Sequence, residues 1–188
     1  MTRKELIINT ARKQIVQHGL YDASIGKIAR AANIPVGSVY TYFDSKESLI
    51  HEIFLQAKGE MNAFIFAEPI SAADDKAEMY IYWERAITYG LAHQEQFFFL
   101  EQYINSPLVL HQSQTAIRAQ FVRTYALLQR GLDAGYLKPL PVDVLHSVIY
   151  THIVGMIKLF CQQPEAFSHT CPPVLFETCW DGLLRHEG

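Results

Sequence analysis

The chain has 188 residues and a mass of 21.5 kDa; 49% of its residues are hydrophobic, 19% are charged, and the mean hydropathy is +0.03. These values exclude an intrinsically disordered chain and a protein embedded in a membrane over most of its length. Three cysteines without close spacing argue against a secreted disulfide scaffold, and the polar start lacks the apolar core of an export signal. We therefore expect a soluble, cytoplasmic protein with one core, or one core and a small appended module.

Charge is distributed unevenly along the chain. Residues 1–50 carry seven Lys or Arg and four Asp or Glu, a net charge of +3, whereas the remaining 138 residues carry nine and fifteen, a net charge of −6. A basic module joined to an acidic one is typical of a protein whose basic part meets a polyanion such as nucleic acid. An excess of three charges also arises by chance, so charge alone leaves both interpretations open.

Helical periodicity predicts a first helix from about Arg3 to His18, with Gly19 placed to end it. The apolar face of this helix consists of Leu6, Ile7, Ala11 and Ile15. A short second helix is expected after Ser24, whose side chain suits a helix N-terminus. Its apolar residues are Ile25, Ile28, Ala29 and Ala32.

A third short helix is expected from Pro35 to about Phe43, because proline fits the first turn of a helix, where its missing N–H is not needed. Asp44 and Glu47 have the spacing of a capping box, in which two residues cap one helix start reciprocally. They predict a fourth, longer helix, whose apolar positions are Leu49, Ile50, Ile53, Phe54 and Ala57.

Prolines divide the rest of the chain into long helical segments. One apolar stripe consists of Ile117, Phe121, Tyr125, Leu128 and Leu132. The stretch from Val142 to Cys161 is apolar nearly all round, so a helix there needs cover on two sides. Its most apolar part, Val144 to Ile157, is interrupted by His146 and His152 and is expected to be too short to span a bilayer. No segment alternates as a strand does, so we expect an all-α fold.

The second and third predicted helices, joined by a tight turn, form a helix-turn-helix candidate. Gly37 has no side chain to hold the third helix away from DNA. Ser24 and Lys46 stand at helix N-termini, where free N–H groups and the helix dipole favour a phosphate, and Lys27 adds positive charge. The outward residues of the third helix are expected to be Val36, Gly37, Ser38, Tyr40, Thr41 and Tyr42. From spacing alone, ordinary packing of two helices explains the same pattern.

Three runs of this region together carry a family resemblance. They are Thr10-Ala11, residues 19–32 (GLYDASIGKIARAA) and residues 36–50 (VGSVYTYFDSKESLI). These runs include an Ile-Ala pair, a Tyr-x-x-Phe step and a Ser-Lys-Glu-x-Leu opening of the fourth helix. They resemble the DNA-binding domain of the TetR family of helix-turn-helix transcriptional repressors, over about the first fifty residues.

The resemblance implies that residues 1–47 form a DNA-binding domain whose third helix enters the major groove. It also implies that Ser24, Tyr40 and Lys46 bind phosphates, while the remaining outward side chains of the third helix face base edges. With the residues singled out above, the expected DNA contacts are Ser24, Lys27, Pro35, Val36, Gly37, Ser38, Tyr40, Thr41, Tyr42 and Lys46.

Two positions depart from the family pattern. Asn33 stands where the family usually has a turn glycine, and asparagine tolerates the left-handed conformation that such a turn needs. The third helix also lacks Arg, Lys, Asn and Gln, the side chains that bind base edges in a bidentate way. We therefore hypothesise that Val36 and Thr41 contact thymine methyl groups and that DNA shape supplies further specificity.

The resemblance implies that residues 48–188 form a helical effector-binding and dimerisation domain. The apolar segments 142–161 and 172–185 are the expected homodimer interface, since a single helix-turn-helix offers little area for specific DNA binding. The alternative is that 142–161 is a buried core helix in a monomer.

Nineteen of the 23 aromatic residues follow residue 50, and a cavity walled by aromatic rings suits an apolar or aromatic effector. Burial in an ordinary core explains most of them equally well. The candidate effector-binding residues are Phe64, Trp83, Ile87, Phe98, Tyr103, Tyr125 and His152.

No cofactor or metal is expected. His51-Glu52 begins like a zinc-protease helix, but Leu55 occupies the position of the second histidine. The sequence thus predicts a regulator, not an enzyme: a repressor that binds a near-palindromic operator as a dimer and is released by a small apolar or aromatic effector. An architectural or partner-controlled DNA-binding protein without an effector is the alternative.

Overall fold

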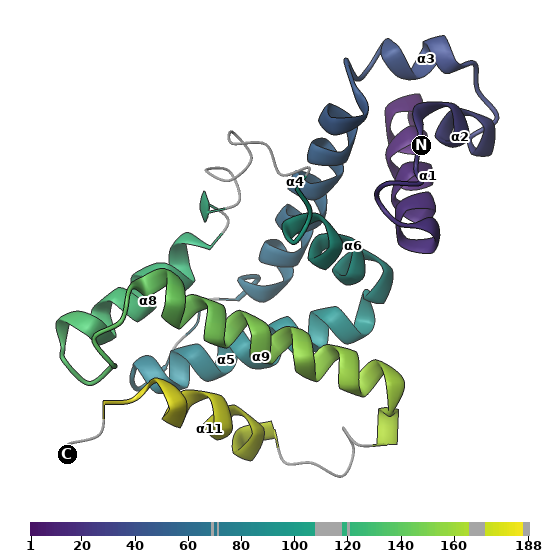
Figure 1. Cartoon of the computed structure of the whole chain (residues 1–188). Helices are drawn as coiled ribbons and strands as arrows, with labels where there is room; N and C mark the ends of the chain where they lie inside the picture. The colour runs from purple at the N-terminus through teal and green to yellow at the C-terminus, as the bar shows by residue number, and fades with distance from the viewer. Residues whose placement is uncertain (69, 71, 108–117, 120, 166–171, 186–188) are drawn as a thin grey trace. The chain divides into compact units, whose positions relative to one another are not determined.

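The computed structural model describes residues 1–68, 70, 72–107, 118–119, 121–165 and 172–185 (Figure 1). The described part of the chain is helical and contains no strand; one isolated antiparallel bridge joins Leu137 and Leu184. The all-α prediction is confirmed. The helices are α1 (Arg3–His18), α2 (Ile25–Ala31), α3 (Val36–Tyr40), α4 (Lys46–Ile65), α5 (Asp75–Ala92), α6 (Gln94–Ile104), α8 (Val122–Asp133), α9 (Val142–Gln162) and α11 (Pro172–Leu183).

The chain divides into two compact units. The first unit comprises residues 1–60 and 93–116, and the second comprises residues 61–92 and 117–188. The first unit therefore contains α6 as well as α1 to α3, because α6 packs against α1. The predicted boundary at residue 47 stays a prediction, and the compact units divide the chain elsewhere.

In the first unit, α1 has the bounds that the sequence predicts. The side chain of Thr2 accepts a hydrogen bond from the N–H of Glu5 at 3.2 Å, and the N–H of Thr2 donates to the Glu5 carboxylate at 2.7 Å. This capping box satisfies two N–H groups that a helix start leaves unpaired. Gly19 ends the helix with φ 86°, a backbone conformation that a side chain disfavours.

The start of α4 corrects one prediction. Ser45, not Asp44, caps the helix: the N–H of Ser48 donates to Ser45 Oγ, and the N–H of Ser45 donates to Ser48 Oγ, both at 3.1 Å. Ser45 directly precedes the first helical residue, so its short hydroxyl reaches the free N–H groups of the first turn. The predicted apolar face of α4 is confirmed by the burial of Leu49, Ile50, Ile53, Phe54 and Ala57.

In the second unit, α9 packs against α5, α8 and α11. The crossing of α5 and α9 is close because Gly90 on α5 has no side chain: a Cβ atom there would lie 2.4 Å from Cδ1 of Ile157. In the predicted stripe on α8, Phe121 and Leu128 are buried, whereas Ile117 lies outside the described residues. Gly135, with φ 79°, follows the end of α8.

The helix α9 (Val142–Gln162) extends one residue beyond the stretch Val142 to Cys161 in which the sequence predicts a helix. It has 21 residues and is, by length and composition alone, long enough and apolar enough to cross a membrane, so the prediction that this stretch is too short was wrong. A core helix of a water-soluble protein passes the same test, and one side of α9 is buried within the second unit, through residues such as Leu145 and Ile149. Its other side exposes Val144, Val148 and Leu159.

Candidate nucleic-acid interface and ligand cavity

The helix-turn-helix is formed by α2 and α3, which pack against each other within the first unit. Ile28 on α2 and Val39 on α3 are completely buried. Asn33 in the turn has φ 54°, which confirms that asparagine adopts the left-handed conformation at this position. Local sequence signals therefore fix the motif, and the two buried apolar residues hold it together.

The regular part of α3 is shorter than the predicted segment from Pro35 to Phe43. Pro35 precedes the helix as its N-cap, and the last turn tightens: the N–H groups of Tyr42 and Phe43 both donate to the carbonyl of Val39, at 3.0 and 3.1 Å. Such tightening is common where a helix ends. The hydroxyl of Thr41 donates to the carbonyl of Gly37 at 3.2 Å, which leaves its methyl group and oxygen lone pairs for other contacts.

The outward side of α3 and the turn after it present large side chains to solvent. Val36, Tyr40 and Tyr42 are 46%, 54% and 43% exposed. The ten residues expected to contact DNA are all exposed or half-buried. The structure thus brings together on one motif an uncharged, partly aromatic surface whose apolar groups have no role in the core.

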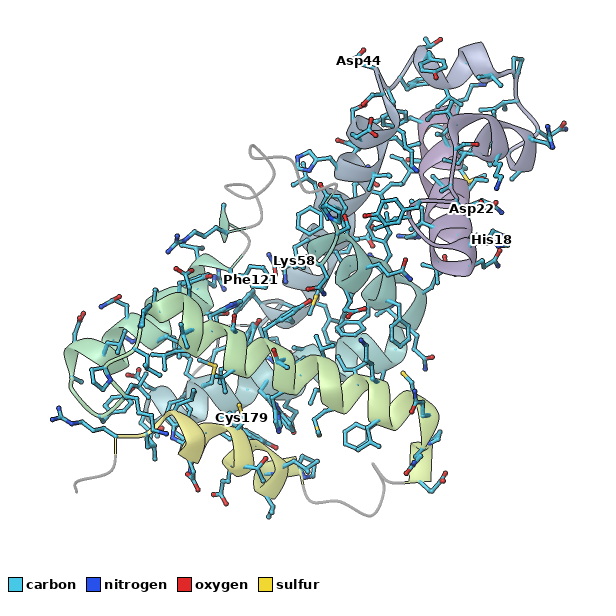
Figure 2. All side chains as sticks on the ribbon, in the orientation of Figure 1. His18, Asp22, Asp44, Lys58, Phe121 and Cys179 are labelled. Atoms are coloured by element: carbon cyan, nitrogen blue, oxygen red, sulfur yellow. The ribbon has the colours of Figure 1, made fainter. Side chains whose placement is uncertain are left out.

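Cationic side chains at this motif already have partners within the protein. Lys27 Nζ lies 2.6 Å from the carboxylate of Asp22, an exposed ion pair whose hydrogen bond lowers the pKa of that carboxyl (Figure 2). Lys46 Nζ donates to the carbonyl of Tyr21 at 3.3 Å and keeps two further donors. The sequence analysis did not single out Tyr21, whose backbone carbonyl accepts this bond and which is 68% exposed.

Two of the residues expected to contact DNA lie at helix starts. The side chain of Ser24 caps α2 by accepting the N–H of Lys27 at 3.2 Å. Gly37 lies at the start of α3, where an added Cβ would meet nothing within 4 Å. The fold therefore does not require a glycine at position 37, and its effect is to keep the outer surface of α3 flat.

The seven candidate effector residues fall in both compact units. Phe98 and Tyr103 belong to the first unit and the other five to the second. Trp83, Ile87 and Tyr103 are almost completely buried. Trp83 is held by a hydrogen bond from its indole N–H to Nδ1 of His152, at 2.9 Å. The effector-binding role of these residues stays a prediction.

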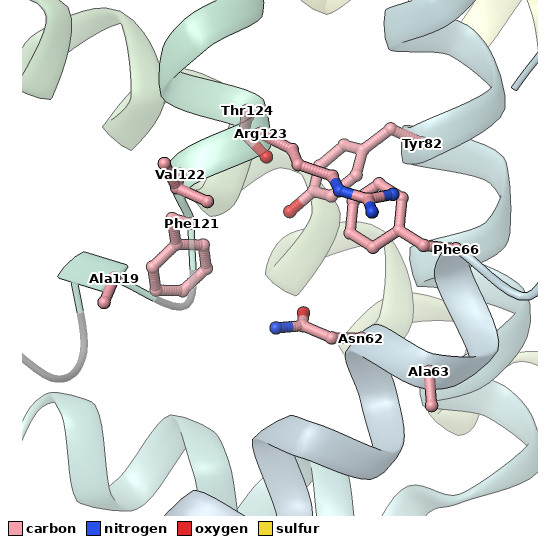
Figure 3. A pocket seen from close by; sticks show the side chains of 9 residues that line it. All are labelled: Asn62, Ala63, Phe66, Tyr82, Ala119, Phe121, Val122, Arg123 and Thr124. Carbon is pink, nitrogen blue, oxygen red and sulfur yellow. The ribbon is translucent and has the colours of Figure 1, made fainter. Parts of the chain in front are cut away.

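The second unit contains a cavity of about 390 Å³ (Figure 3). Its lining residues are Asn62, Ala63, Phe66, Tyr82, Ala119, Phe121, Val122, Arg123 and Thr124. A smaller cavity shares Phe66, Tyr82, Arg123 and Thr124 and adds Ile70, Glu78 and Leu127. None of the seven candidate effector residues lines either cavity. Phe66, Tyr82 and Phe121 carried a sequence signal as members of the aromatic set, and Phe121 also as part of the apolar stripe.

Residues 7–53 match the family model described as "Bacterial regulatory proteins, tetR family". Over these residues the chain is therefore similar to the tetR family of bacterial regulatory proteins. Over 55 residues it is 44% identical to an Escherichia coli K12 protein named "Probable acrEF/envCD operon repressor", a match that covers 29% of this chain and 24% of that protein. Over 59 residues it is 39% identical to the transcriptional regulator YhgD of Bacillus subtilis, covering 31% of each. Both matches thus span a third or less of the relative's length.

Similarity to solved TetR-family structures extends over the whole chain. A transcription regulator from Shewanella sp. PV-4 has a TM-score of 0.90 and 25% identity, covering 99% of this chain and 100% of that one. The regulator FadR from Bacillus subtilis, solved in complex with stearoyl-CoA, has a TM-score of 0.71 at 18% identity, covering 98% and 99%. The second likeness shows the shared TetR-family fold alone.

Proposed function

We propose that this protein is a transcriptional repressor that inserts α3 into the major groove of an operator. The observation that carries the proposal is the exposed face of α3 and of the turn after it. Val36, Tyr40 and Tyr42 are exposed there, on a motif whose inner residues are buried. Clustered large apolar side chains that are exposed to solvent do not stabilise the fold, so such a cluster indicates a surface that binds a partner. The matched repressor in Escherichia coli supports the direction of regulation.

In this proposal, phosphates bind at the start of α2, beside Ser24, and at the start of α4, beside Lys46. Lys27 joins them by exchanging its exposed bond to Asp22 for a phosphate. The groove-facing residues are those of α3 and the turn after it, with Thr41 and Val36 against thymine methyl groups. A helix without bidentate donors relies on such apolar contacts and on DNA shape.

The repressor acts as a homodimer that pairs two reading helices on a near-palindromic operator. Support comes from the uncovered apolar side of α9 and from Val174 on α11, which is 56% exposed. Covering these residues with the same helices of a second copy removes apolar surface from water. A dimer interface also accounts for the apolar composition of α9. In this proposal the protein is water-soluble and cytoplasmic and has no enzymatic activity.

A small effector binds in the cavity of the second unit and shifts the protein toward a conformation with weaker DNA affinity. The cavity volume of about 390 Å³ supports this role, since ligand pockets begin at about 300 Å³. The effector must bind the released conformation better than the DNA-bound one, because a ligand shifts an equilibrium only through that difference.

The test begins with selection of a preferred duplex from random DNA, followed by fluorescence anisotropy at several salt concentrations. Lys46→Ala is expected to weaken binding to every duplex and to lower the slope of log K against log salt by about 1. Thr41→Ala is expected to change the base preference at single positions. Lys76→Ala is the matched control, because Lys76 lies on α5 in an exposed ion pair with Glu177 at 3.4 Å.

Two outcomes contradict the proposal. If selection at modest ionic strength enriches no duplex, the protein is not a sequence-specific regulator. If Lys46→Ala and Lys76→Ala give the same salt slope, the assigned phosphate contact is wrong.

A further inference from the structure

The wall of the cavity combines aromatic surface with a small number of polar groups. Phe66, Tyr82 and Phe121 contribute rings, whereas Asn62, Arg123 and Thr124 contribute hydrogen-bonding groups. Figure 3 shows the amide of Asn62 directed into the space and the guanidinium of Arg123 extended across it toward Phe66. An aromatic body with one charged group is the ligand shape that such a wall complements.

Arg123 is the charged group of this wall. Its guanidinium carbon lies 4.3 Å from the ring centroid of Phe66, a cation–π contact that holds the side chain over the cavity. A guanidinium stacked in this way keeps its N–H donors at the ring edge, where they are able to bind a carboxylate in a bidentate way.

Neighbouring arginines differ from Arg123 in having carboxylate partners. Arg118 pairs with Asp143 at 3.4 Å, and Arg130 binds both Asp75 and Glu78. Within the described ranges no acidic residue forms an ion pair with Arg123. Glu78 lies on the wall of the adjoining smaller cavity, and its carboxylate is paired with Arg130.

The hydroxyl groups of the wall add no negative charge. Burial raises the pKa of Tyr82, so its phenol stays protonated at neutral pH, and Thr124 is its hydrogen-bonding partner. The larger cavity thus has one cation and no anion among its described lining residues.

We propose that the effector is a small monocarboxylic acid with an aromatic or compact apolar body, whose carboxylate binds Arg123. The aromatic body lies against Phe66 and Phe121, and the amide of Asn62 lies within the same space. The inference rests on the proposed effector response and narrows its ligand class. The volume, near the lower end for ligand pockets, fits a single-ring or two-ring acid in preference to a long acyl chain joined to a nucleotide.

Isothermal titration and thermal-shift measurements on the full chain test this assignment. The probes are benzoate, phenylacetate, 3-phenylpropionate, 1-naphthoate and hexanoate, each compared with its primary amide, which keeps the shape and removes the charge. We expect at least one acid to bind about 10- to 100-fold more tightly than its amide, as a charge-assisted hydrogen bond implies. Arg123→Gln is expected to abolish this preference.

Arg118→Gln is the matched control, since Arg118 is an exposed arginine shortly before α8 and does not line the cavity. It removes the same charge from the unit and is expected to retain the preference for the acid. The proposal is overturned if no acid binds better than its amide, or if the preference survives Arg123→Gln. The comparison within the wild-type protein stands even if the Arg123 variant fails to fold.

DNA binding is measured separately, on the protein without probe. A protein that binds its selected duplex but shows no preference for acids retains the proposed function and loses this ligand class. A protein that binds acids through Arg123 but enriches no duplex retains the site and loses the proposed function.

Discussion

The buried lysine on α4 gives the sharpest prediction. Lys58 is only 3% exposed, and its position follows Phe54 by one helical turn, on the side of α4 that is buried (Figure 2). Burial disfavours the charged ammonium and lowers the pKa of Lys58 from 10.5 to about 7. We predict that Lys58→Met, which has similar length and no charge, stabilises the protein at pH 7.

The magnitude follows from the shift in pKa. A difference of 3.5 units between 10.5 and about 7 corresponds to about 5 kcal/mol, at 1.36 kcal/mol for each unit. Between pH 7 and 10.5 the unfolded chain holds a proton on Lys58 that the folded chain has lost. The free energy of unfolding of the wild type therefore rises with pH in this window. Below pH 7 the cost of the buried charge stays constant.

Urea denaturation at pH 7.0, 8.0 and 9.0, with the protomer concentration held fixed, measures the effect. Lys58→Met should be more stable than the wild type by several kcal/mol at pH 7.0, and this advantage should shrink by about 1.4 kcal/mol for each pH unit. Lys76→Met replaces an exposed lysine on α5 and should leave the pH dependence unchanged. Parallel curves for Lys58→Met and the wild type would refute the reasoning.

Three further predictions use the same denaturation assay. Gly37→Ala and the control Gly59→Ala should each stabilise the protein by about 0.5–1 kcal/mol, because an added Cβ atom meets no other atom within 4 Å at either position. Only Gly37→Ala should weaken DNA binding in gel shifts. Gly90→Ala should lower the free energy of unfolding by about 1–3 kcal/mol. The loss should be smaller in an Ile157→Val background, because valine lacks the Cδ1 atom that the new Cβ would meet. Strictly additive effects of the two substitutions would contradict the close packing. Burial lowers the pKa of His152 below 6.5, so the folded state binds fewer protons at this residue than the unfolded chain, and the free energy of unfolding should fall as pH drops below 6.5. His152→Gln should flatten this pH dependence. An unchanged dependence in the variant would contradict the assignment to His152.

The N-terminal motif was predictable because its signals are local. The cap at Ser24, the left-handed Asn33 and the alternation of buried and exposed positions in α3 depend on neighbours within a few residues along the chain. Backbone conformation and hydrogen bonds of this range follow from residue type. The start of α4 shows the limit, since Ser45 and Asp44 are both good caps and only the geometry of the first turn decides between them.

The same type of argument failed to locate the cavity. Phe66 and Trp83 are both aromatic residues of the second unit, yet Phe66 lines the cavity and Trp83 packs against Phe176 and donates to His152. Periodicity assigns each to an apolar face but does not say whether that face meets another helix or an open space. The burial of Lys58 was hidden for a similar reason, because lysine is usually found at the surface.

The sequence by itself therefore determined the all-α fold, α1, α2 and the turn between α2 and α3. The residues expected to contact DNA remain its prediction. Only the tertiary structure decided that Arg123 faces a cavity, that Lys58 is buried, and that α9 has one covered and one uncovered side. The physical reason is the range of the interactions. Caps and turns are fixed by contacts between residues a few positions apart in the sequence. Cavities and buried charges depend on how closely helices that are distant in the sequence cross. In the second unit, the crossing of α5 and α9 depends on the close contact between Gly90 and Ile157.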